Sequence, residues 1–230
     1  MELKDLNKIV KLSDEQLNQF DSYARFLVEY NEKINLTAIT EYGEIVEKHF
    51  YDSLLLSRYR SMSGTLVDVG TGAGFPGVVL KIAYPELKVV LIEPLHKRCV
   101  FLNELIEKLG LKDIEVLNVR AEDYSKNHRE KYDYVTARAV TNLNALIELC
   151  GAMVKLDGCF VALRGKDGLS EIDNAAYAIK TMGFEVEDTY TESLSDGSMR
   201  VISFFGKRNK TPNKYPRSYS LIKKGPICQK

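Results

Sequence analysis

Apolar residues in the first third of the chain recur with the period of an amphipathic helix. Six of them fall on positions that share one helix face: Leu17, Phe20, Tyr23, Ala24, Leu27 and Tyr30. Such spacing is the main signal for a helix with one buried side. Ser13 and Gln16 precede the run and form the Ser-x-x-Gln pattern of a capping box, which marks a helix start. A second helical stretch is predicted at residues 42–59.

From residue 65 the pattern changes to short apolar runs that alternate with longer amphipathic segments. The runs, which predict strands, lie at residues 65–69, 88–93, 115–119, 132–137 and 159–164. The segments between and after them predict helices at residues 76–83, 97–109, 144–154 and 170–182. Strands separated by helices are typical of parallel βαβ units in a doubly wound sheet.

Two further β-like runs, residues 184–192 and 200–206, are joined only by a turn-forming segment. Without a helix between them, they should pair as an antiparallel hairpin. The sequence therefore predicts an α/β, Rossmann-like fold: a mostly parallel seven-stranded sheet with a terminal antiparallel hairpin, plus N-terminal helices. We expect a helical extension packed on the core (1–60), the core itself (61–206) and a C-terminal tail (207–230).

Cysteine usage and the absence of long apolar runs bear on where the protein acts. The four cysteines form no Cys-x-x-Cys pair, which disfavours a zinc site or a disulfide framework. The N-terminus lacks the basic flank and apolar core of a signal peptide. No run reaches the roughly 18 apolar residues that a membrane span needs. We therefore expect a cytoplasmic monomer with no metal and no membrane partner.

The zero net charge conceals a strong asymmetry along the chain. Residues 206–230 contain eight Lys or Arg and no Asp or Glu, whereas residues 1–205 contain 24 basic and 32 acidic residues. A basic tail on an acidic body is typical of proteins that contact a polyanion. A solvated tail without a partner is the alternative.

Residues 66–77, with the sequence LVDVGTGAGFPG, contain four glycines directly after an apolar strand. Glycine lets the backbone turn sharply and approach a ligand without a Cβ in the way. The last three glycines, with Glu93 placed 21 residues after Gly72, match the dinucleotide fingerprint. Asp68 and Gly70 match equally well the acid-and-glycine loop of enzymes that use S-adenosylmethionine. With either ligand, Glu93 would accept hydrogen bonds from a ribose diol.

Three features favour S-adenosylmethionine. Asp68 stands two residues before the first glycine, where it suits a ligand with an ammonium group and would repel a pyrophosphate. The third predicted strand is followed by Ala121, Glu122 and Asp123, whose backbone and carboxylates are placed to meet an adenine edge. The sheet ends in a hairpin, whereas the dinucleotide fold continues into a second βαβ half. A tight turn with no ligand is the remaining alternative.

Stretches spread over nearly the whole chain resemble the ribosomal RNA small-subunit methyltransferase G family, also called glucose-inhibited division protein B. They include DVGTGAGFPG, YDYVTARAV, GCFVALRGK and the tail TPNKYPR, in the family's order. The resemblance implies a class I S-adenosylmethionine-dependent methyltransferase that acts on N7 of one guanine in 16S ribosomal RNA. It also implies a set of cofactor-binding residues: Gly70, Phe75, Ala121, Glu122 and Arg138.

Reasoning from the residues adds Asp68, Gly72 and Glu93 to the cofactor site. For Arg138, a surface ion pair with a neighbouring acid is the alternative role. Arginine is always charged, and its planar fork can hold either a carboxylate or a base edge.

The residue types agree with a reaction at guanine N7. This nitrogen carries a free in-plane lone pair and can attack the sulfonium methyl directly, so positioning suffices without a general base. We therefore expect no catalytic residue. Cys150 and Cys159 lie in apolar segments and are interpreted as core rather than as nucleophiles. His49, in an amphipathic helix, is interpreted as structural.

Cations near the expected ligand edge and in the tail are the candidate RNA contacts: Arg164, Lys166, Lys207, Arg208, Lys214, Arg217, Lys223 and Lys224. Arg164 and Lys166 follow a strand at the edge where ligands bind in open α/β sheets, although a solvated surface role is equally open. Pro212 and Pro216 predict an extended arm that lies along the domain surface near the cofactor edge. Its Tyr215 and Tyr219 are suited to stack on unpaired bases. Removing that arm should leave cofactor binding nearly unchanged, because the residues assigned to the cofactor lie outside it. The expected partner is 16S ribosomal RNA or a precursor of the small subunit.

Three other functions stay open on the sequence alone. One is a small-molecule methyltransferase, which predicts a closed apolar pocket and gives no reason for an acid-free tail. The second is an RNA-binding or assembly factor that retains S-adenosylmethionine only for stability. The third is a dinucleotide oxidoreductase.

Overall fold

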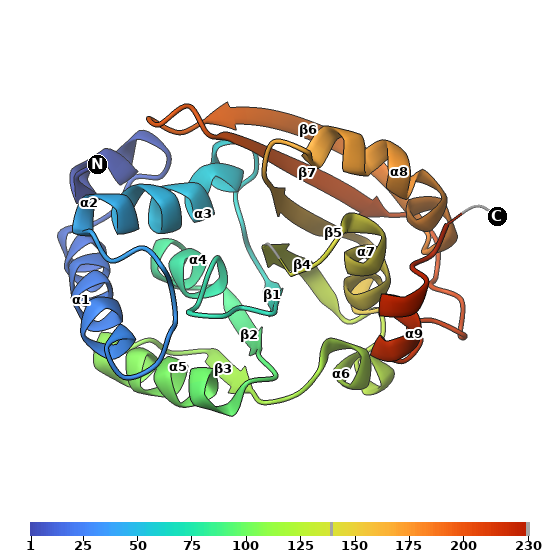
Figure 1. Ribbon diagram of the computed structural model, residues 1–230, viewed down its shortest axis with the longest axis horizontal. Helices are drawn as coiled ribbons and strands as arrows, with labels where there is room; N and C mark the ends of the chain where they lie inside the picture. Colours follow the sequence, from blue (N-terminus) through green and yellow to red (C-terminus); the bar gives the residue numbers. More distant parts are fainter. Residues whose placement is uncertain (139, 229–230) are drawn as a thin grey trace.

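A seven-stranded sheet forms the centre of the protein (Figure 1) in a computed structural model that describes residues 1–138 and 140–228. The strands are β1 (Thr65–Val69), β2 (Lys88–Ile92), β3 (Ile114–Leu117), β4 (Tyr132–Arg138), β5 (Val154–Arg164), β6 (Phe184–Ser193) and β7 (Met199–Lys207). Their order is β3-β2-β1-β4-β5-β7-β6. Strands β1 to β5 are parallel, whereas β7 runs antiparallel to both β5 and β6. The predicted mostly parallel sheet with a terminal hairpin is confirmed.

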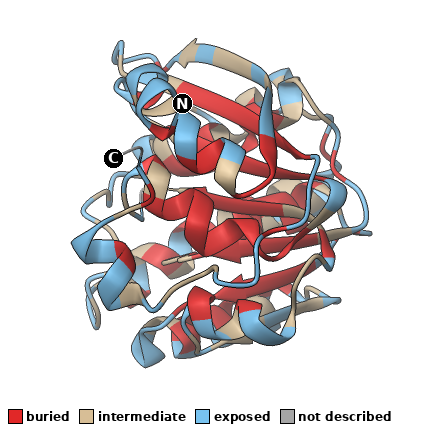
Figure 2. Ribbon diagram, turned by 90° about the vertical axis from the view of Figure 1, so that its right-hand side faces the viewer, coloured by how far each residue is buried: buried red, intermediate tan, exposed pale blue. Residues whose placement is uncertain are grey.

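Helices cover both faces of the sheet. The N-terminal helices, α4 (Gly77–Ala83) and α5 (His96–Leu109) lie on one face; α6 (Ala121–Asn127), α7 (Leu143–Gly151) and α8 (Gly168–Thr181) lie on the other. Alternate residues of a strand point to opposite faces, and the neighbours Leu66 and Val67 accordingly join two different apolar clusters. Figure 2 shows the buried strands between helical layers whose outer sides are exposed.

The N-terminal segment begins with η1 (Leu3–Lys8) and α1 (Asp14–Asn31). The predicted capping box is confirmed: the backbone N–H of Gln16 donates to Ser13 Oγ at 3.2 Å, and that of Ser13 donates to Gln16 Oε1 at 2.8 Å. The buried face of α1 packs in the same apolar cluster as α4 and α5.

Residues 42–59, predicted as one helical stretch, are helical but change geometry along their length. Helix α2 (Tyr42–Ile45) leads into a π-helix, η2 (Val46–Tyr51), followed by α3 (Asp52–Leu54) and the 3-10 helix η3 (Leu55–Arg58). π-Helical turns are rare and occur frequently at functional sites. This one contacts the carboxyl end of β4.

Several boundaries differ from those predicted. Helix α7 ends at Gly151, and β5 begins at Val154, where the strand was predicted from residue 159. The extension forms because Val154 already pairs with Tyr132 of β4. Strand β3 stops at Leu117. Helices α6 and α9 (Tyr219–Lys224) were not predicted, because they are short and lack the apolar run that marks α4, a helix of similar length.

The C-terminal segment, residues 208–228, is not the extended arm that Pro212 and Pro216 predicted. It folds back over α7, includes α9, and buries Ile222 and Ile227 in the second apolar cluster (Figure 1). Each proline restricts only its own backbone and that of the preceding residue. The rest of the segment is therefore free to bury its apolar side chains.

Candidate functional site

The chain turns sharply after β1, and Asp68 holds both ends of that turn. Its Oδ2 accepts hydrogen bonds from Thr71 Oγ1 at 2.6 Å and from the backbone N–H of Gly77 at 2.8 Å. The side chain is fully buried, and burial raises the pKa of its carboxyl to about 6. The other oxygen, Oδ1, has no hydrogen-bond partner within the described structure. Asp68 thus shapes the loop and keeps one buried acceptor unsatisfied, which calls for a ligand or a water.

Three of the four glycines in residues 66–77, namely Gly70, Gly74 and Gly77, are required by packing, and Gly72 borders open space. A Cβ on Gly70 would lie 2.7 Å from Val140 Cγ2, and one on Gly74 would lie 2.6 Å from Tyr23 Oη. Gly72 has a left-handed backbone with φ of +61°, but a Cβ there would meet only the carbonyl oxygen of Gly70, at 4.0 Å. A ligand can therefore approach the backbone closely at Gly72.

Glu93 follows β2 and points back at the glycine loop. Its Oε2 accepts a hydrogen bond from the backbone N–H of Gly72 at 3.0 Å, and its Oε1 accepts one from that of Leu95 at 2.8 Å. The guanidinium of Arg98 lies 3.7 Å from the same carboxylate, which is almost entirely buried. A buried carboxylate beside the open space at Gly72 is suited to accept charge-assisted hydrogen bonds from a diol.

A narrow cavity of about 100 Å³ lies beside Gly70. Ala121 and Glu122, the first residues of α6, line it, as do Arg120 and Tyr219. Apolar side chains complete the lining: Val69, Ile92, Pro94, Val140 and Leu149. An apolar slot with few polar groups is the usual form of a site for an aromatic ligand. The structure thus brings together three of the predicted cofactor residues, which follow β1 and β3.

Arg138 ends β4, on the other side of the glycine loop. Its guanidinium carbon lies 4.9 Å from the centre of the Phe75 ring, and its Nη1 donates to the carbonyl oxygen of Lys48 at 3.2 Å. These two predicted cofactor residues therefore contact each other, and Arg138 borders a second space, described below. The alternative role for Arg138, an ion pair with an acid, is also present, because Asp52 binds it.

His49 is held as a neutral ring between aromatic and polar partners. It stacks on Phe75 with ring centres 4.4 Å apart, and Thr37 Oγ1 lies 2.9 Å from its Nε2. Burial, with the nearby Arg138 cation as the second cause, lowers the pKa of His49 to about 3. The interpretation of His49 as a structural residue agrees with this packing.

Asp52 links two arginines that come from different strands. Its Oδ2 accepts from Arg138 Nη1 at 2.9 Å, and its Oδ1 accepts from Arg200 Nε at 2.8 Å. These residues line a cavity of about 300 Å³ together with Ile39, Lys48, His49, Leu163, Arg164 and Gly165. Cations outnumber the single carboxylate in this lining, so the cavity is suited to an electron-rich or anionic ligand.

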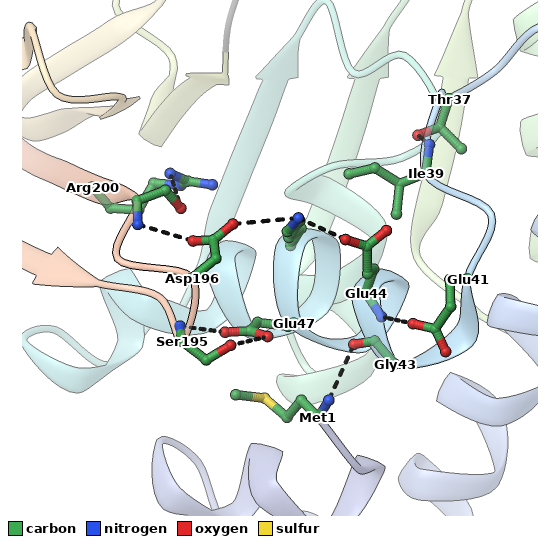
Figure 3. Close-up of polar contacts among 12 residues, drawn as sticks. Met1, Thr37, Ile39, Glu41, Gly43, Glu44, Glu47, Ser195, Asp196 and Arg200 are labelled. Carbon is green, nitrogen blue, oxygen red and sulfur yellow. Dashed lines mark hydrogen bonds and ion pairs between the residues drawn. The ribbon is translucent and has the colours of Figure 1, made fainter.

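The hairpin turn between β6 and β7 is clamped onto the π-helix (Figure 3). Glu47 accepts hydrogen bonds from the backbone N–H of Ser195 at 2.6 Å and from its Oγ at 2.7 Å. Lys48 forms ion pairs with Asp196 at 3.3 Å and with Glu44 at 2.7 Å. The clamp fixes the start of β7, and with it Arg200, against η2, which leads directly into α3 and its first residue, Asp52.

The predicted RNA-contact residues have very different environments. Lys166, Lys214, Lys223 and Lys224 are exposed. Arg164 lines the arginine-rich cavity and pairs with Glu171.

Two of the tail arginines are engaged with carboxylates. Arg208 binds Glu187 at 2.7 Å, and Arg217 binds Glu148 at 2.6 Å. Their charges are thus partly neutralised within the protein.

The prediction that Lys207 contacts RNA is wrong. It is fully buried, and its Nζ donates to the carbonyl oxygens of Gly151 at 2.9 Å and Met182 at 2.7 Å, and to Thr211 Oγ1. Burial lowers the pKa of its ammonium to about 7. Strand β7 extends to Lys207 and carries the side chain to the C-terminal ends of α7 and α8, where it is shielded from solvent.

The charged residues of these cavities that were not singled out from the sequence are Lys48, Asp52, Arg120 and Arg200. Tyr219 was singled out, but as a tail residue that stacks on RNA bases. Arg200 is the first charged residue after a hairpin turn, and Arg120 directly precedes Ala121 and Glu122, so both carried a weak signal. Their position is decided by contacts between segments far apart in the chain.

The structure also shows where the cysteines lie and which side chains gather near one another. Cys150 and Cys159 are buried, which confirms their interpretation as core, and burial raises the pKa of both thiols. Among residues 1–138 and 140–228, no group of three or more His, Cys, Asp or Glu side chains is arranged to hold a metal ion. Within the same residues, no helix is both long enough and apolar enough to cross a membrane.

Comparison with known protein families gives a match over most of the chain. Residues 16–198 match the family model described as rRNA small subunit methyltransferase G. A curated relative of that name from Staphylococcus saprophyticus is 45% identical over 225 residues, which cover 96% of this chain and 94% of the relative. One from Listeria monocytogenes is 46% identical over 225 residues, with the same coverage of both chains.

Solved structures of methyltransferases share the fold at low sequence identity. A ribosomal protein L11 methylase from Lactobacillus delbrueckii subsp. bulgaricus superposes with a TM-score of 0.54 at 17% identity, over 70% of this chain and 79% of that one. A 16S rRNA (adenine(1408)-N(1))-methyltransferase from Catenulisporales acidiphilia has a TM-score of 0.52 at 15% identity, over 64% and 88%. At these identities the likeness concerns the fold alone.

Proposed function

The chain belongs to the rRNA small subunit methyltransferase G family, and from this premise we propose that it methylates N7 of a guanine in 16S ribosomal RNA. It is an S-adenosylmethionine-dependent methyltransferase. The proposal concerns the base, the atom, the RNA and the residues that bind them.

The residues at the carboxyl edge of the sheet fit the cofactor, which supplies an electrophilic methyl group on a sulfonium. Glu93 would accept the ribose hydroxyls, because its buried carboxylate lies beside the open backbone of Gly72. The narrow cavity lined by Ala121 and Glu122 would hold the adenine ring. The unpartnered Oδ1 of Asp68 is the buried acceptor that the donor end of such a ligand, or a bridging water, would satisfy.

The arginine-rich cavity lies further along the same edge and would hold the target base. Guanine presents the acceptor O6 beside N7, and an arginine N–H that binds O6 leaves the N7 lone pair free to attack the methyl group. Arg138 and Arg200 are oriented by Asp52. This pair of cavities on either side of the glycine loop, one shaped for a cofactor and one lined by cations, is the observation that carries the proposal.

Guanine N7 attacks the methyl group without first losing a proton. The protein therefore needs only to position the base and to exclude water. His49, the nearest imidazole, has a pKa lowered to about 3 and both ring nitrogens near partners, Thr37 and Arg138. It is therefore a poor acceptor of a proton. The arginine forks would fix the plane of the guanine in line with the methyl group, which is the main source of rate in such a reaction.

The proposed partner is 16S ribosomal RNA or a precursor of the small subunit, contacted by the exposed cations Lys166, Lys214, Lys223 and Lys224 and by Arg164 at the cavity. Such a substrate implies a cytoplasmic enzyme. That the protein acts as a monomer stays a prediction.

The decisive experiment is transfer of radiolabelled methyl groups to 16S RNA and to 30S particles from a strain that lacks the enzyme. We expect label in one guanine, which becomes sensitive to borohydride and aniline cleavage when N7 carries a methyl group. Label in another base would refute the assignment of guanine N7 as the methylated atom. Label only in small molecules would refute the proposal that RNA is the substrate. Calorimetry with S-adenosylhomocysteine and with NADH separately tests the cofactor.

A further inference from the structure

The outer wall of the narrow cavity comes from the far end of the chain. Tyr219, the first residue of α9, lines it together with Gly70, Ala121 and Glu122. The guanidinium of Arg120, the residue before Ala121, lies over the Tyr219 ring, 5.1 Å from its centre. The C-terminal segment therefore contributes an aromatic ring to a cavity that is otherwise lined by the sheet and the helices that follow it.

A buried ion pair attaches this segment to α7. Glu148 of α7 has a fully buried side chain, and its carboxylate accepts three hydrogen bonds from Arg217: from the backbone N–H at 2.9 Å, from Nε at 2.8 Å and from Nη2 at 2.6 Å. The next residue of α7, Leu149, lines the cavity. Separating the pair would leave a buried charge without a partner, which is strongly unfavourable. The segment and the cavity wall on α7 are thus held together.

Further contacts fix the segment on both sides of Tyr219. Arg129 donates to the carbonyl oxygens of Thr211 at 2.8 Å and Tyr215 at 2.6 Å. Asn144 Nδ2 donates to the carbonyl oxygen of Ile227 at 2.9 Å. In Figure 1, α9 accordingly lies beside α6 and α7. An attachment at both ends leaves the tyrosine ring little freedom to leave the cavity.

We propose that the C-terminal segment is a part of the cofactor site and that Tyr219 covers the adenine ring of S-adenosylmethionine. The proposal rests on the assignment of the cofactor's adenine to the narrow cavity. It contradicts one expectation from the sequence, namely that loss of the tail leaves cofactor binding nearly unchanged. An aromatic ring against a purine excludes water and contributes stacking or edge contacts. The same segment carries exposed cations, so RNA contact and cofactor retention depend on one element.

The test is the dissociation constant of S-adenosylhomocysteine, measured by calorimetry on the full chain without RNA. Tyr219→Ala should raise it about tenfold, the size expected when a base loses its contact with an aromatic side chain. Tyr219→Phe keeps the ring and should change the constant by less than about twofold. Tyr177→Ala removes an exposed tyrosine of α8, outside the cavity, and should have no effect. The melting temperature of each variant shows whether it folds.

Glu93→Gln separates this inference from the assignment on which it rests. If Glu93→Gln weakens binding and folded Tyr219→Ala does not, the role of the segment is refuted and the cofactor site stands. If neither variant weakens binding, the assignment of the site fails and the inference with it. In the wild type, S-adenosylhomocysteine should also slow tryptic cleavage within residues 208–228, because a ligand that contacts the segment stabilises its folded form. An unchanged cleavage rate would contradict the proposal.

Discussion

Asp52 is the residue whose replacement most directly tests how the arginine-rich cavity is built. Its carboxylate is 4% exposed and binds Arg138 and Arg200 at 2.9 and 2.8 Å. Asp52→Asn keeps the shape of the side chain but removes its charge. Only one of the two arginines can then face an oxygen, and the other faces an amide that is itself a donor.

The size of the effect follows from these two contacts. Hydrogen bonds to charged groups contribute about 1.5–3 kcal/mol each, and one of the two is lost. The arginine side chains are 16% and 22% exposed, so water offsets part of the loss. We therefore expect the free energy of unfolding to fall by about 2 kcal/mol. For a chain of this size that lowers the melting temperature by about 4–8 °C.

Methyl transfer should be affected more than folding or cofactor binding. If the forks of Arg138 and Arg200 lose their orientation toward the base, kcat/KM for RNA should fall by about ten- to a hundredfold, as a loss of about 1.4–2.8 kcal/mol implies. The assay measures kcat and KM for RNA at saturating S-adenosylmethionine, with the dissociation constant of S-adenosylhomocysteine alongside.

A neighbouring carboxylate provides the control. Glu44→Gln removes the ion pair with Lys48 on the exposed side of the same helical stretch and should leave all these quantities nearly unchanged. If Asp52→Asn methylates RNA as fast as the wild type, the arginine pair does not position the base, and the proposed base site is wrong.

The remaining predictions concern the loop, the acid after β2 and the buried imidazole. Glu93→Gln should weaken S-adenosylhomocysteine binding about ten- to a hundredfold, as the loss of charge-assisted bonds to a diol implies; an unchanged constant in calorimetry would remove Glu93 from the site. Gly72→Ala should lower the melting temperature only slightly. Its Cβ meets open space, so the only cost is about 1–2 kcal/mol for a left-handed backbone. The same variant should bind cofactor at least about tenfold more weakly. Gly74→Ala should instead destabilise the fold, since its Cβ meets Tyr23 and Val78; equal melting temperatures would contradict this contrast. His49 has a pKa of about 3 when folded and about 6.5 when unfolded, so the unfolded chain binds more protons between these values and stability falls as the pH drops below 6.5. Between pH 7 and pH 5 the wild type should lose about 2 kcal/mol more than His49→Gln, and equal losses in urea unfolding would show that His49 is not held neutral.

Local patterns determined most of the fold. The alternation of apolar runs and amphipathic segments predicted the seven strands, their order of appearance and the terminal hairpin, because periodicity and turn residues act over a few positions. The same local rules identified the glycine loop, the acid after β2 and the buried cysteines. They failed at α6 and α9, which are short and lack the apolar run that marks α4.

Tertiary structure decided which cations of the tail stay exposed and which are buried or paired with carboxylates. Lys207, Arg208 and Arg217 are three cations of one basic tail, yet the first is buried and the other two bind Glu187 and Glu148. Their sequence neighbourhood is the same, so no local pattern distinguishes them. The difference arises because β7 and the segment after it pack against α7 and α8, which are distant in the chain.

The residues of the candidate site likewise fall into those predicted from the sequence and those placed only by the fold. The sequence predicted Gly70, Gly72, Glu93, Ala121 and Glu122 as a set, since each follows a parallel strand and the carboxyl ends of such strands meet at one edge. Only the fold placed Asp52 and Arg200 at that edge and made Tyr219 part of a cavity wall. These residues come from a helix, a hairpin and a C-terminal segment whose positions depend on long-range contacts. Burial and pairing are properties of neighbours in space, and a single sequence records neighbours along the chain.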